Sequence, residues 1–280
     1  MTTLTTRPDR TSDDFDDSDV VDVQHVTQLR VLRSEWIKLR SLRSTALTLA
    51  AAVVLMVAMG WIFGWAMNAN WSDLRPDEQA SFNAVDTTLA GYNLAQLAIG
   101  VLGVLLVTGE YATGMIRATF GAVPRRLPVL WAKAALYVGV TFTLMLGAAF
   151  VAFVGGQQLL GTHGTTLSAE GAVRAIVGVA GYLALIGVFS VALGFIVRST
   201  AGGVATLFGL LLVVPTLGLL LPASWRENLL PYLPSNAGGT MFSASSAPDA
   251  LSASTSLLVL LGWVAAALVC AAVVLRKRDA

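Results

Sequence analysis

Charged side chains are scarce in this chain of 280 residues: Asp, Glu, Lys and Arg make up 12% of it, against 55% hydrophobic residues. A soluble globular domain carries about 25% charged residues. A chain this apolar cannot cover its surface with polar groups in water, and its mean hydropathy is +0.71. The composition therefore excludes an ordinary soluble protein and predicts a protein embedded in lipid.

Cysteine and histidine are almost absent. The one cysteine, Cys270, lies in an apolar run, and a single cysteine cannot form a disulfide within the chain. The two histidines, His25 and His163, lie far apart, whereas a metal site needs more ligands at closer spacing. The residues therefore predict no disulfide framework, no metal site and no cofactor bound by this chain.

Lysine is equally rare, and its positions exclude a common nucleotide site. A P-loop requires Gly-Lys followed by Ser or Thr, because the lysine reaches the phosphates and the glycines let backbone N–H groups surround them. The only lysines are Lys38, Lys133 and Lys277, and none of them follows a glycine. The chain therefore has no P-loop of its own, and any ATP that drives it must be hydrolysed by another chain.

Six stretches have charge-free cores long enough to cross a bilayer. About 20 helical residues, at about 1.5 Å each, span the roughly 30 Å hydrocarbon core. We expect helices, because a helix satisfies its own backbone hydrogen bonds in lipid. The sequence thus predicts an all-α, polytopic membrane protein with six transmembrane helices. The predicted spans are about 45–67, 88–109, 129–156, 173–197, 199–221 and 254–275.

Two local features of these spans make further predictions. The fourth and fifth spans are separated only by Arg198, which predicts a helical hairpin that turns at 198–203. Gly60 and Gly64 form a GxxxG pair in the first span, which is typical of closely packed helices.

Basic residues are unevenly distributed over the segments that connect the spans. Fifteen of the 18 Lys and Arg residues lie before the first span, between the second and third, at Arg198, or after the sixth. Only Arg75, Arg174 and Arg226 lie in the other connections. Because basic linkers stay on the cytoplasmic side, both termini are expected in the cytoplasm. An even number of spans requires the two termini to share a side, which agrees with this expectation. The expected location is the cell (plasma) membrane, as a multi-pass protein.

Two segments before the first span differ in character. Residues 1–25 are rich in aspartate and lack the apolar core of a signal peptide, so we expect a disordered, acidic cytoplasmic tail. Residues 26–43 place Leu29, Leu32 and Trp36 at steps of three and four, on one face of a helix. Because basic residues cover much of the rest, we expect a helix in the membrane interface. A solvated run of charge is the alternative.

The segment 109–133 is too polar to cross the bilayer and connects the second and third spans on the expected cytoplasmic side. Ile116 and Phe120 are four residues apart, which predicts a short helix with an apolar side. Gly121 and Pro124 are expected to end that helix. An ordinary basic loop is the alternative.

This segment resembles the cytoplasmic loop of type-2 ATP-binding cassette (ABC-2) permeases. That family has an acidic residue after the second span, then Gly-Thr-hydrophobic-Arg, a Pro followed by Arg, and Ala-Lys at the start of the third span. Stretch 34–41 is similar to the family's N-terminal elbow helix and 276–279 to its last residues, so the likeness covers 26–279. Met115 departs from the pattern, since the family usually has Thr there. The matching loop residues are Glu110, Gly114, Ile116, Arg117, Pro124, Arg125, Arg126, Ala132 and Lys133.

The resemblance implies the membrane subunit of an ABC exporter. In that family the loop is a coupling helix that docks on a separate ATPase subunit, which binds ATP and Mg²⁺. Two permease chains work together, as a homodimer or a heterodimer. The implied partners are therefore the ATPase subunit, a second permease chain and the lipid bilayer, with no nucleic acid. Carried over to this sequence, the coupling interface comprises Glu110, Tyr111, Gly114, Arg117, Phe120, Arg125 and Arg126.

Polar residues inside the spans are few. Tyr92, Asn93 and Gln96 lie in the second span, which borders the transport path in the family. Polar groups in lipid face other protein or a cavity, so these three are candidates for the substrate pathway. Hydrogen bonding between helices is the alternative. The shortage of polar groups favours an amphipathic or lipid-like substrate.

Two other functions stay open at this stage, a membrane-bound enzyme or accessory protein and an ion-coupled carrier. An enzyme needs an acid, base or metal cluster in the membrane, and a carrier usually has a carboxylate at mid-membrane. The charge-free cores contain neither. We therefore expect a transporter subunit rather than an enzyme. The presence of an ATPase subunit with a Walker motif as a partner would favour the ABC transporter subunit over the other two functions.

Overall fold

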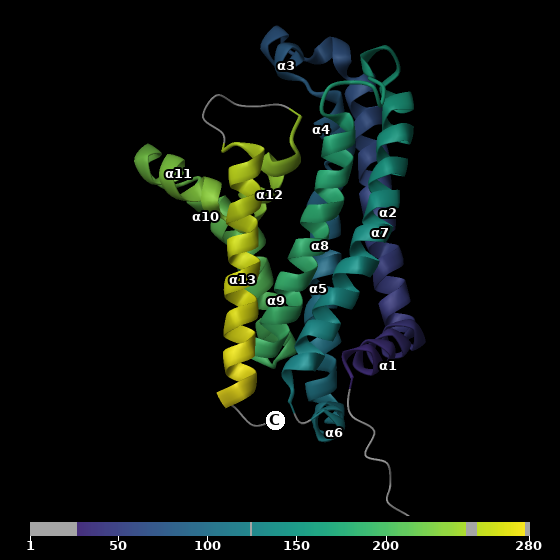
Figure 1. Ribbon diagram of the computed structural model, residues 1–280. Coiled ribbons are helices and arrows are strands. Elements are labelled where there is room, and N and C mark those ends of the chain that lie inside the picture. The colour runs from purple at the N-terminus through teal and green to yellow at the C-terminus, as the bar shows by residue number, and fades with distance from the viewer. Residues whose placement is uncertain (1–26, 124, 245–250, 278–280) are drawn as a thin grey trace, which may run out of the picture.

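The structure is a computed structural model that describes residues 27–123, 125–244 and 251–277. Within these ranges every regular element is helical (Figure 1). The predicted acidic tail, residues 1–25, lies outside the described residues. The elements are α1 (Gln28–Ser41), α2 (Arg43–Ala69), η1 (Trp71–Asp73), α3 (Pro76–Ser81), α4 (Ala84–Leu89), α5 (Tyr92–Ala112), α6 (Met115–Ala122), α7 (Leu127–Leu160), η2 (Gly161–His163), α8 (Ala172–Val197), α9 (Thr200–Phe208), η3 (Gly209–Val213), α10 (Val214–Gly218), α11 (Ala223–Leu229), η4 (Leu230–Tyr232), α12 (Pro234–Phe242) and α13 (Ala253–Lys277).

Among the described residues, six helical stretches are long and apolar enough to cross a membrane, which confirms the predicted all-α architecture. The fourth and fifth stretches form the predicted hairpin. Arg198 ends α8 in the left-handed conformation, with a φ of 57°, and the Ser199 side chain accepts a hydrogen bond from the Gly202 N–H at the start of α9. The stretches are Arg43–Ala69, Ala84–Ala112, Leu127–His163, Ala172–Val197, Thr200–Gly218 and Ala253–Lys277.

Two spans are less regular than their sequences suggest. The second span is interrupted between α4 and α5, where the α2 backbone passes so close that a Cβ on Gly91 would lie 2.3 Å from the Met56 carbonyl oxygen. The fifth span contains a π-helical turn, η3, just before Pro215. Proline cannot donate the hydrogen bond that would continue a regular helix, so the backbone widens there.

The second and third spans also extend further than predicted. In the second span the extension adds charged residues, whereas the charged residue of the third already lies within the predicted span 129–156. Asp86 lies in the first turn of the stretch 84–112, Glu110 lies in its last turn, and Lys133 lies near the start of the third stretch. All three are near the ends of their spans. The expectation of spans free of acidic and basic groups therefore holds for their centres only.

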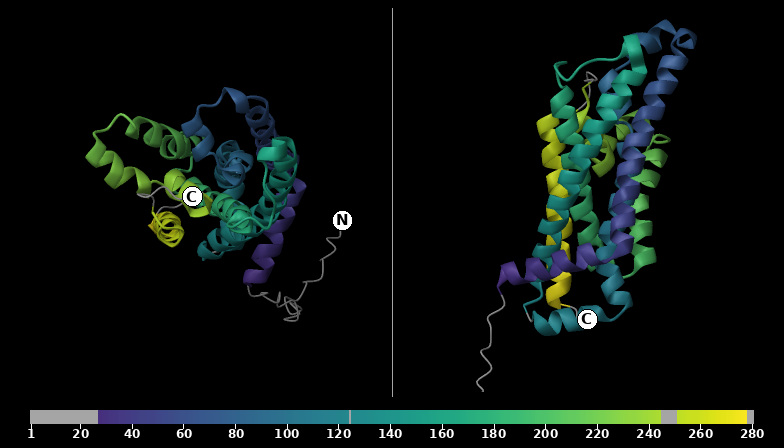
Figure 2. Two further views of the ribbon diagram at one scale, coloured as in Figure 1. Left: turned by 90° about the horizontal axis from the view of Figure 1, so that it is seen from above. Right: turned by 90° about the vertical axis from the view of Figure 1, so that its right-hand side faces the viewer.

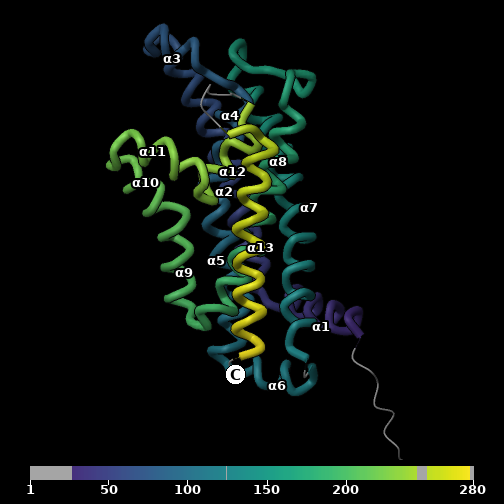
Figure 3. The backbone as a smooth tube through the Cα atoms, turned by 60° about the vertical axis from the view of Figure 1, so that its left-hand side comes forward, coloured from purple at the N-terminus to yellow at the C-terminus, as the bar shows by residue number. Residues whose placement is uncertain are grey.

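Helix α8 is the centre of the bundle and packs against α5, α7, α12 and α13. Tyr182 and Phe195 of α8 are fully buried, and so is Tyr137 of α7, whose hydroxyl donates a 2.5 Å hydrogen bond to the Ile99 carbonyl of α5. Helices α2, α9 and α13 lie further out, as Figure 3 shows for α9, and most of their residues are at least partly exposed. That surface suits contact with hydrocarbon or with another apolar chain.

The GxxxG pair of α2 allows close packing within the chain. A Cβ on Gly60 would lie 2.3 Å from the Thr88 carbonyl oxygen of α4, and one on Gly64 would lie 2.7 Å from the Gly156 carbonyl oxygen of α7. Glycine is needed at both positions because the backbones approach too closely for a side chain. The pair therefore serves helix packing inside the bundle.

The two ends of the bundle differ. Helices α1 and α6 and the last turn of α13 lie at one end, which we call the α6 end, while α3 lies at the other (Figure 1). Figure 2 shows that α1 crosses the bundle at this end instead of running along it. Helix α1 covers most of the segment predicted as an interfacial helix. Among the described basic residues, those of α1, α6, the start of α7 and the end of α13 gather at the α6 end.

Candidate functional site

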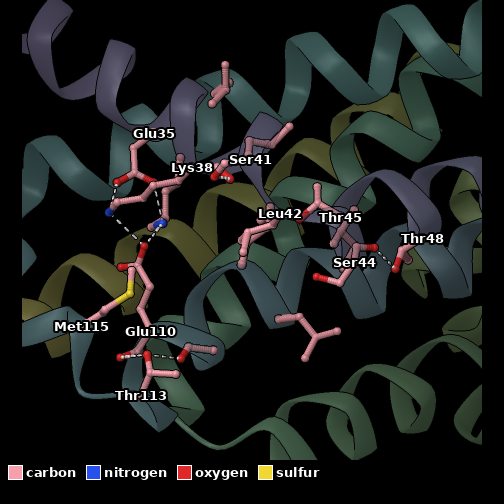
Figure 4. A pocket seen from close by; sticks show the side chains of 17 residues that line it. Glu35, Lys38, Ser41, Leu42, Ser44, Thr45, Thr48, Glu110, Thr113 and Met115 are labelled. Carbon is pink, nitrogen blue, oxygen red and sulfur yellow. Dashed lines mark hydrogen bonds and ion pairs between the residues drawn. The ribbon is translucent and has the colours of Figure 1, made fainter.

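Four charged side chains meet at the α6 end, and we call them the ionic cluster. Glu35 and Lys38 come from α1, Glu110 from the last turn of α5, and Lys133 from the second turn of α7. Figure 4 shows Glu35, Lys38 and Glu110 turned toward one another. Residues from three regions of the sequence thus form one polar site in a bundle that is otherwise apolar.

The two lysines bridge the two glutamates. Lys133 Nζ lies 2.5 Å from Glu35 Oε2 and 2.8 Å from Glu110 Oε1. Lys38 Nζ lies 2.8 Å from Glu35 Oε1 and 3.0 Å from Glu110 Oε1. Lys38 also donates a 3.3 Å hydrogen bond to the Thr119 hydroxyl of α6. The ionic cluster therefore connects α1, α5, α6 and α7.

Local structure explains why these side chains meet. Val31 and Glu35 lie one helical turn apart on the buried face of α1, and Lys38 follows at i+3 of Glu35. Helix α5 ends two residues beyond Glu110, and Gly114 reverses the chain into α6 with a φ of 73°. That left-handed conformation favours glycine. The turn carries α6 back beneath α1, next to Lys38.

The cluster is buried and electrically balanced. The side chains of Lys133, Glu35 and Glu110 are 5%, 4% and 9% exposed, and that of Lys38 is 29% exposed. Two carboxylates and two ammonium groups give a formal charge of zero. Buried charges are tolerated only when they are paired, and removing one partner costs about 3–5 kcal/mol. The cluster is therefore a strong constraint on how the four helices fit together.

The neighbouring charges keep Glu35 and Lys38, the two members of the cluster on α1, ionised at neutral pH. Burial alone would raise the pKa of Glu35, but the Lys133 and Lys38 ammonium groups outweigh it and hold the pKa below its ordinary value of 4.5. Burial alone would lower the pKa of Lys38, but the Glu35 and Glu110 carboxylates hold it above its ordinary value of 10.5. The site is thus built from charged groups.

A cavity of about 610 Å³ adjoins the ionic cluster. All four charged residues line it, and so do several Ser and Thr residues and leucines such as Leu105 and Leu136. Glu110 Oε1 accepts hydrogen bonds from both lysines, while Glu110 Oε2 is buried without a hydrogen-bond partner in the described part of the chain. The cavity therefore combines an apolar wall with an unused buried acceptor.

No protein-family model and no curated protein matches this chain. The resemblance to ABC-2 permeases therefore rests on its sequence motifs. Among the residues that the structure describes, no group of three or more His, Cys, Asp or Glu side chains could hold a metal ion.

The predicted coupling residues divide into three sets, exposed, buried and half-buried. Gly114, Arg117 and Arg125 are exposed, whereas Glu110 and Phe120 are buried within the chain. The prediction treats Phe120 as contact area for another subunit, yet its side chain packs in the core of this one. Only the exposed set is positioned to touch another chain directly.

The other two predicted coupling residues, Tyr111 and Arg126, are half-buried and make contacts within the chain. The Arg198 guanidinium lies 5.2 Å from the centre of the Tyr111 ring. The Arg126 guanidinium lies 5.5 Å from the centre of the Phe120 ring, and its Nη1 donates a 3.3 Å hydrogen bond to the Leu275 carbonyl of α13. These contacts join the segment around α6 to the turn between α8 and α9, at Arg198, and to α13.

The predicted pathway residues do not act as one group. Gln96 is buried and accepts a hydrogen bond from the Tyr182 hydroxyl of α8. The Tyr92 ring makes edge contacts with the rings of Tyr182 and Phe242, at 5.8 and 4.7 Å between centroids. Asn93 is exposed, and its side chain donates to the Ala90 carbonyl. Gln96 and Tyr92 thus join α5 to α8 and α12. The contact of Gln96 is the hydrogen bonding between helices that stands as the alternative to a substrate pathway.

Sequence reasoning did not foresee the ionic cluster. It predicted an apolar face with Leu29 and Trp36 for the membrane interface, and these side chains are 78% and 45% exposed, but it did not predict that Val31 and Glu35 are buried. A carboxylate followed at i+3 by a lysine is common on solvated helices, so nothing local marks Glu35 as buried. The lysine at the start of an otherwise apolar span, Lys133, is the one signal that could have suggested a buried partner.

Proposed function

We propose that this chain is the transmembrane subunit of an ABC exporter. In this proposal it moves an amphipathic or lipid-like substrate out of the cytoplasm across the plasma membrane, using ATP and Mg²⁺ bound by a separate ATPase subunit. A second permease chain, identical or different, completes the transporter. Both termini and the α6 end face the cytoplasm. The observation that carries the proposal is the ionic cluster, because it fastens the short helix α6 to three other helices.

A coupling helix must pass movement to the spans instead of absorbing it. Helix α6 has two such connections: Thr119 accepts from Lys38, which is paired with both glutamates, and the buried Ile116 and Phe120 anchor the helix in the core. A displacement of α6 is therefore resisted by α1, α5 and α7 together. Packed networks of this kind shift between discrete arrangements and so can transmit a push.

The outer surface of α6 suits a docking contact. Met115 and Arg117 are exposed, and so are the small residues Ala118 and Gly121, which allow a partner backbone to approach closely. Exposed arginines at the edge of such a contact steer association and fix its register. Arg117 and Arg125 are therefore assigned to the contact itself, and the buried Glu110 to its support.

Helix α1 fits the role of an elbow helix at the membrane surface. Its inward face carries Val31 and Glu35, while Leu29, Trp36 and Ile37 remain exposed at the end of the bundle. Exposed aromatic and aliphatic side chains on a helix that crosses the bundle suit the interface between head groups and hydrocarbon. The exposed apolar surfaces of α2, α9 and α13 leave room for lipid and for the second permease chain.

The test is purification of the tagged full-length chain from its native membrane, followed by measurement of ATP hydrolysis and identification of co-purifying chains that carry a Gly-Lys-Ser/Thr P-loop. We expect such a chain, and we expect Arg117→Glu to reduce both its yield and the ATPase activity at least tenfold. Arg276→Glu is the matched control, because Arg276 is exposed at the same end but lies on α13. Purification without an ATPase chain, or equal loss in both variants, would refute the proposal.

A further inference from the structure

The cavity beside the ionic cluster has the shape of an amphiphile site. Its volume of about 610 Å³ is within the range of small-molecule pockets, roughly 300–1,000 Å³. Leu102, Leu105, Leu106 and Leu136 line it, and the four charged residues, which meet in one place, line what we call its polar end. The leucine lining suits hydrocarbon, and the polar end suits a polar head group.

The cavity is open to the surroundings of the bundle. Leu42 and Leu105, which both line it, are 51% and 39% exposed. Leu105 belongs to the second membrane span and Leu42 joins α1 to the first. The opening therefore lies on the lipid-facing side of the bundle, near one end of the spans. A lipid of the adjacent leaflet is the ligand that reaches it without leaving the membrane.

The polar end needs a hydrogen-bond donor. Glu110 Oε2 is buried without a hydrogen-bond partner in the part of the chain that the structure describes, and an unsatisfied buried carboxylate oxygen is costly. Figure 4 shows the Met115 side chain beside the Glu110 carboxylate. Met115 is 49% exposed and also lines the cavity, so a bound head group can displace its flexible side chain.

We infer that this cavity binds a phospholipid with a primary ammonium in its head group, such as phosphatidylethanolamine. The ammonium donates to Glu110 Oε2, and the phosphate lies near Lys38, the most exposed member of the cluster, and the hydroxyls of Ser41 and Ser44. The upper part of an acyl chain lies on Leu105 and its neighbours. This inference concerns the purified chain alone and does not depend on the proposed transport function.

Charge and hydrogen bonding together favour this head group over two common alternatives. The ionic cluster has a formal charge of zero, and a zwitterionic head group leaves the cavity neutral, whereas an anionic one adds a buried net charge. Phosphatidylcholine is also zwitterionic, but its trimethylammonium group has no N–H to donate. Phosphatidylethanolamine alone of the three supplies both a balanced charge and a donor for Glu110.

The experiment measures binding of phosphatidylethanolamine, phosphatidylcholine and phosphatidylglycerol with identical acyl chains to the detergent-solubilised chain, by native mass spectrometry. We expect phosphatidylethanolamine to bind about tenfold more tightly than phosphatidylcholine, a factor that corresponds to ~1.4 kcal/mol. Phosphatidylglycerol should also bind more weakly than phosphatidylethanolamine. Equal affinity for the three lipids would mean non-specific lipid contact and would overturn the inference.

Two variants separate the site from the rest of the surface. Glu110→Gln should bring the affinities for phosphatidylethanolamine and phosphatidylcholine within twofold of each other, because the two lysines hold the amide oxygen and the NH2 group that replaces Oε2 cannot accept from the ammonium. Leu105→Trp should fill the cavity and weaken phosphatidylethanolamine binding about tenfold while the ionic cluster stays intact. Leu258→Trp, at a residue of α13 that is 68% exposed, is the control and should bind as the unmodified chain does. A preference that survives Leu105→Trp would refute the site even if Glu110→Gln does not fold.

Discussion

At the residue scale, the decisive feature of this protein is that a mostly hydrophobic chain places two of its three lysines against two buried glutamates. Helix α1 contributes half of this cluster, although its sequence alone predicts only a basic helix in the membrane interface. Its buried face is selected by Glu110 and Lys133, which are far away in the sequence. Hydrophobic spacing predicts that α1 is a helix, but it cannot predict which face packs on the protein.

Replacing Lys133 should destabilise the fold strongly. Lys133→Ala leaves the Glu35 and Glu110 carboxylates buried with only the partly exposed Lys38 as a counter-charge, and we expect a loss of about 3–5 kcal/mol. Thermal unfolding in detergent, followed by tryptophan fluorescence, measures the effect. Lys277→Ala, at an exposed lysine at the end of α13, is the control and should shift the midpoint by little. A midpoint for Lys133→Ala that matches this control would show that the ionic cluster does not stabilise the fold.

The pH dependence of stability should also report the cluster. The pKa of Glu35 is lowered in the folded chain, so its stabilising effect is present above its ordinary pKa of 4.5 and is lost as the pH falls through the folded value. The pKa of Lys38 is raised, so its effect is present below its ordinary pKa of 10.5 and is lost as the pH rises through the folded value. We expect a plateau of the unfolding midpoint between these limits.

Glu35→Gln tests the acid side of this plateau. The variant removes the carboxylate that titrates, so its midpoint should be lower than that of the unmodified chain at neutral pH and should change less as the pH falls below 4.5. Unfolding scans of both chains from pH 3 to pH 8 provide the comparison. Parallel curves for the two chains would contradict the assigned role of Glu35.

At the scale of elements, the sequence predicted where the spans are but not how they deviate from straight helices. Long apolar runs are a local signal, and all six produced helices. The interruption at Gly91 depends on the Met56 carbonyl of another helix, and the π-helical turn depends on how Pro215 is accommodated. The GxxxG pair predicted close packing, while its partners in α4 and α7 emerge only from the three-dimensional arrangement.

Two glycine-to-alanine substitutions should therefore differ in their effect on the unfolding midpoint. Gly60→Ala places a Cβ 2.3 Å from the Thr88 carbonyl oxygen, so α2 and α4 must separate and the unfolding midpoint should fall. Gly262→Ala, on the outer face of α13, meets no atom within 4 Å and should leave the midpoint unchanged or raise it, since alanine favours a helix by about 1 kcal/mol. Equal midpoints for the two variants would show that the α2–α4 contact is looser than described.

At the scale of the whole molecule, the gathering of basic residues at the α6 end predicts how the chain lies in the membrane. The segments that gather at the α6 end carry most of the described lysines and arginines, and the α3 end carries few. Basic segments stay in the cytoplasm during insertion. The distribution of basic residues therefore predicts that the α6 end lies in the cytoplasm. The proposed function requires the same orientation, because α6 can meet an ATPase subunit only in the cytoplasm.

Thiol labelling of intact cells tests this orientation directly. Cys270, the one native cysteine, is replaced by serine, and single cysteines are then introduced by Ala118→Cys on α6 and Asp77→Cys on α3, both at exposed positions. A membrane-impermeant maleimide added outside the cells should label position 77 and spare position 118, and permeabilised cells should show labelling at both. If position 118 reacts from outside, the α6 end faces away from ATP. In that case neither docking on an ATPase nor transmission through the ionic cluster can operate, however stable the cluster proves to be.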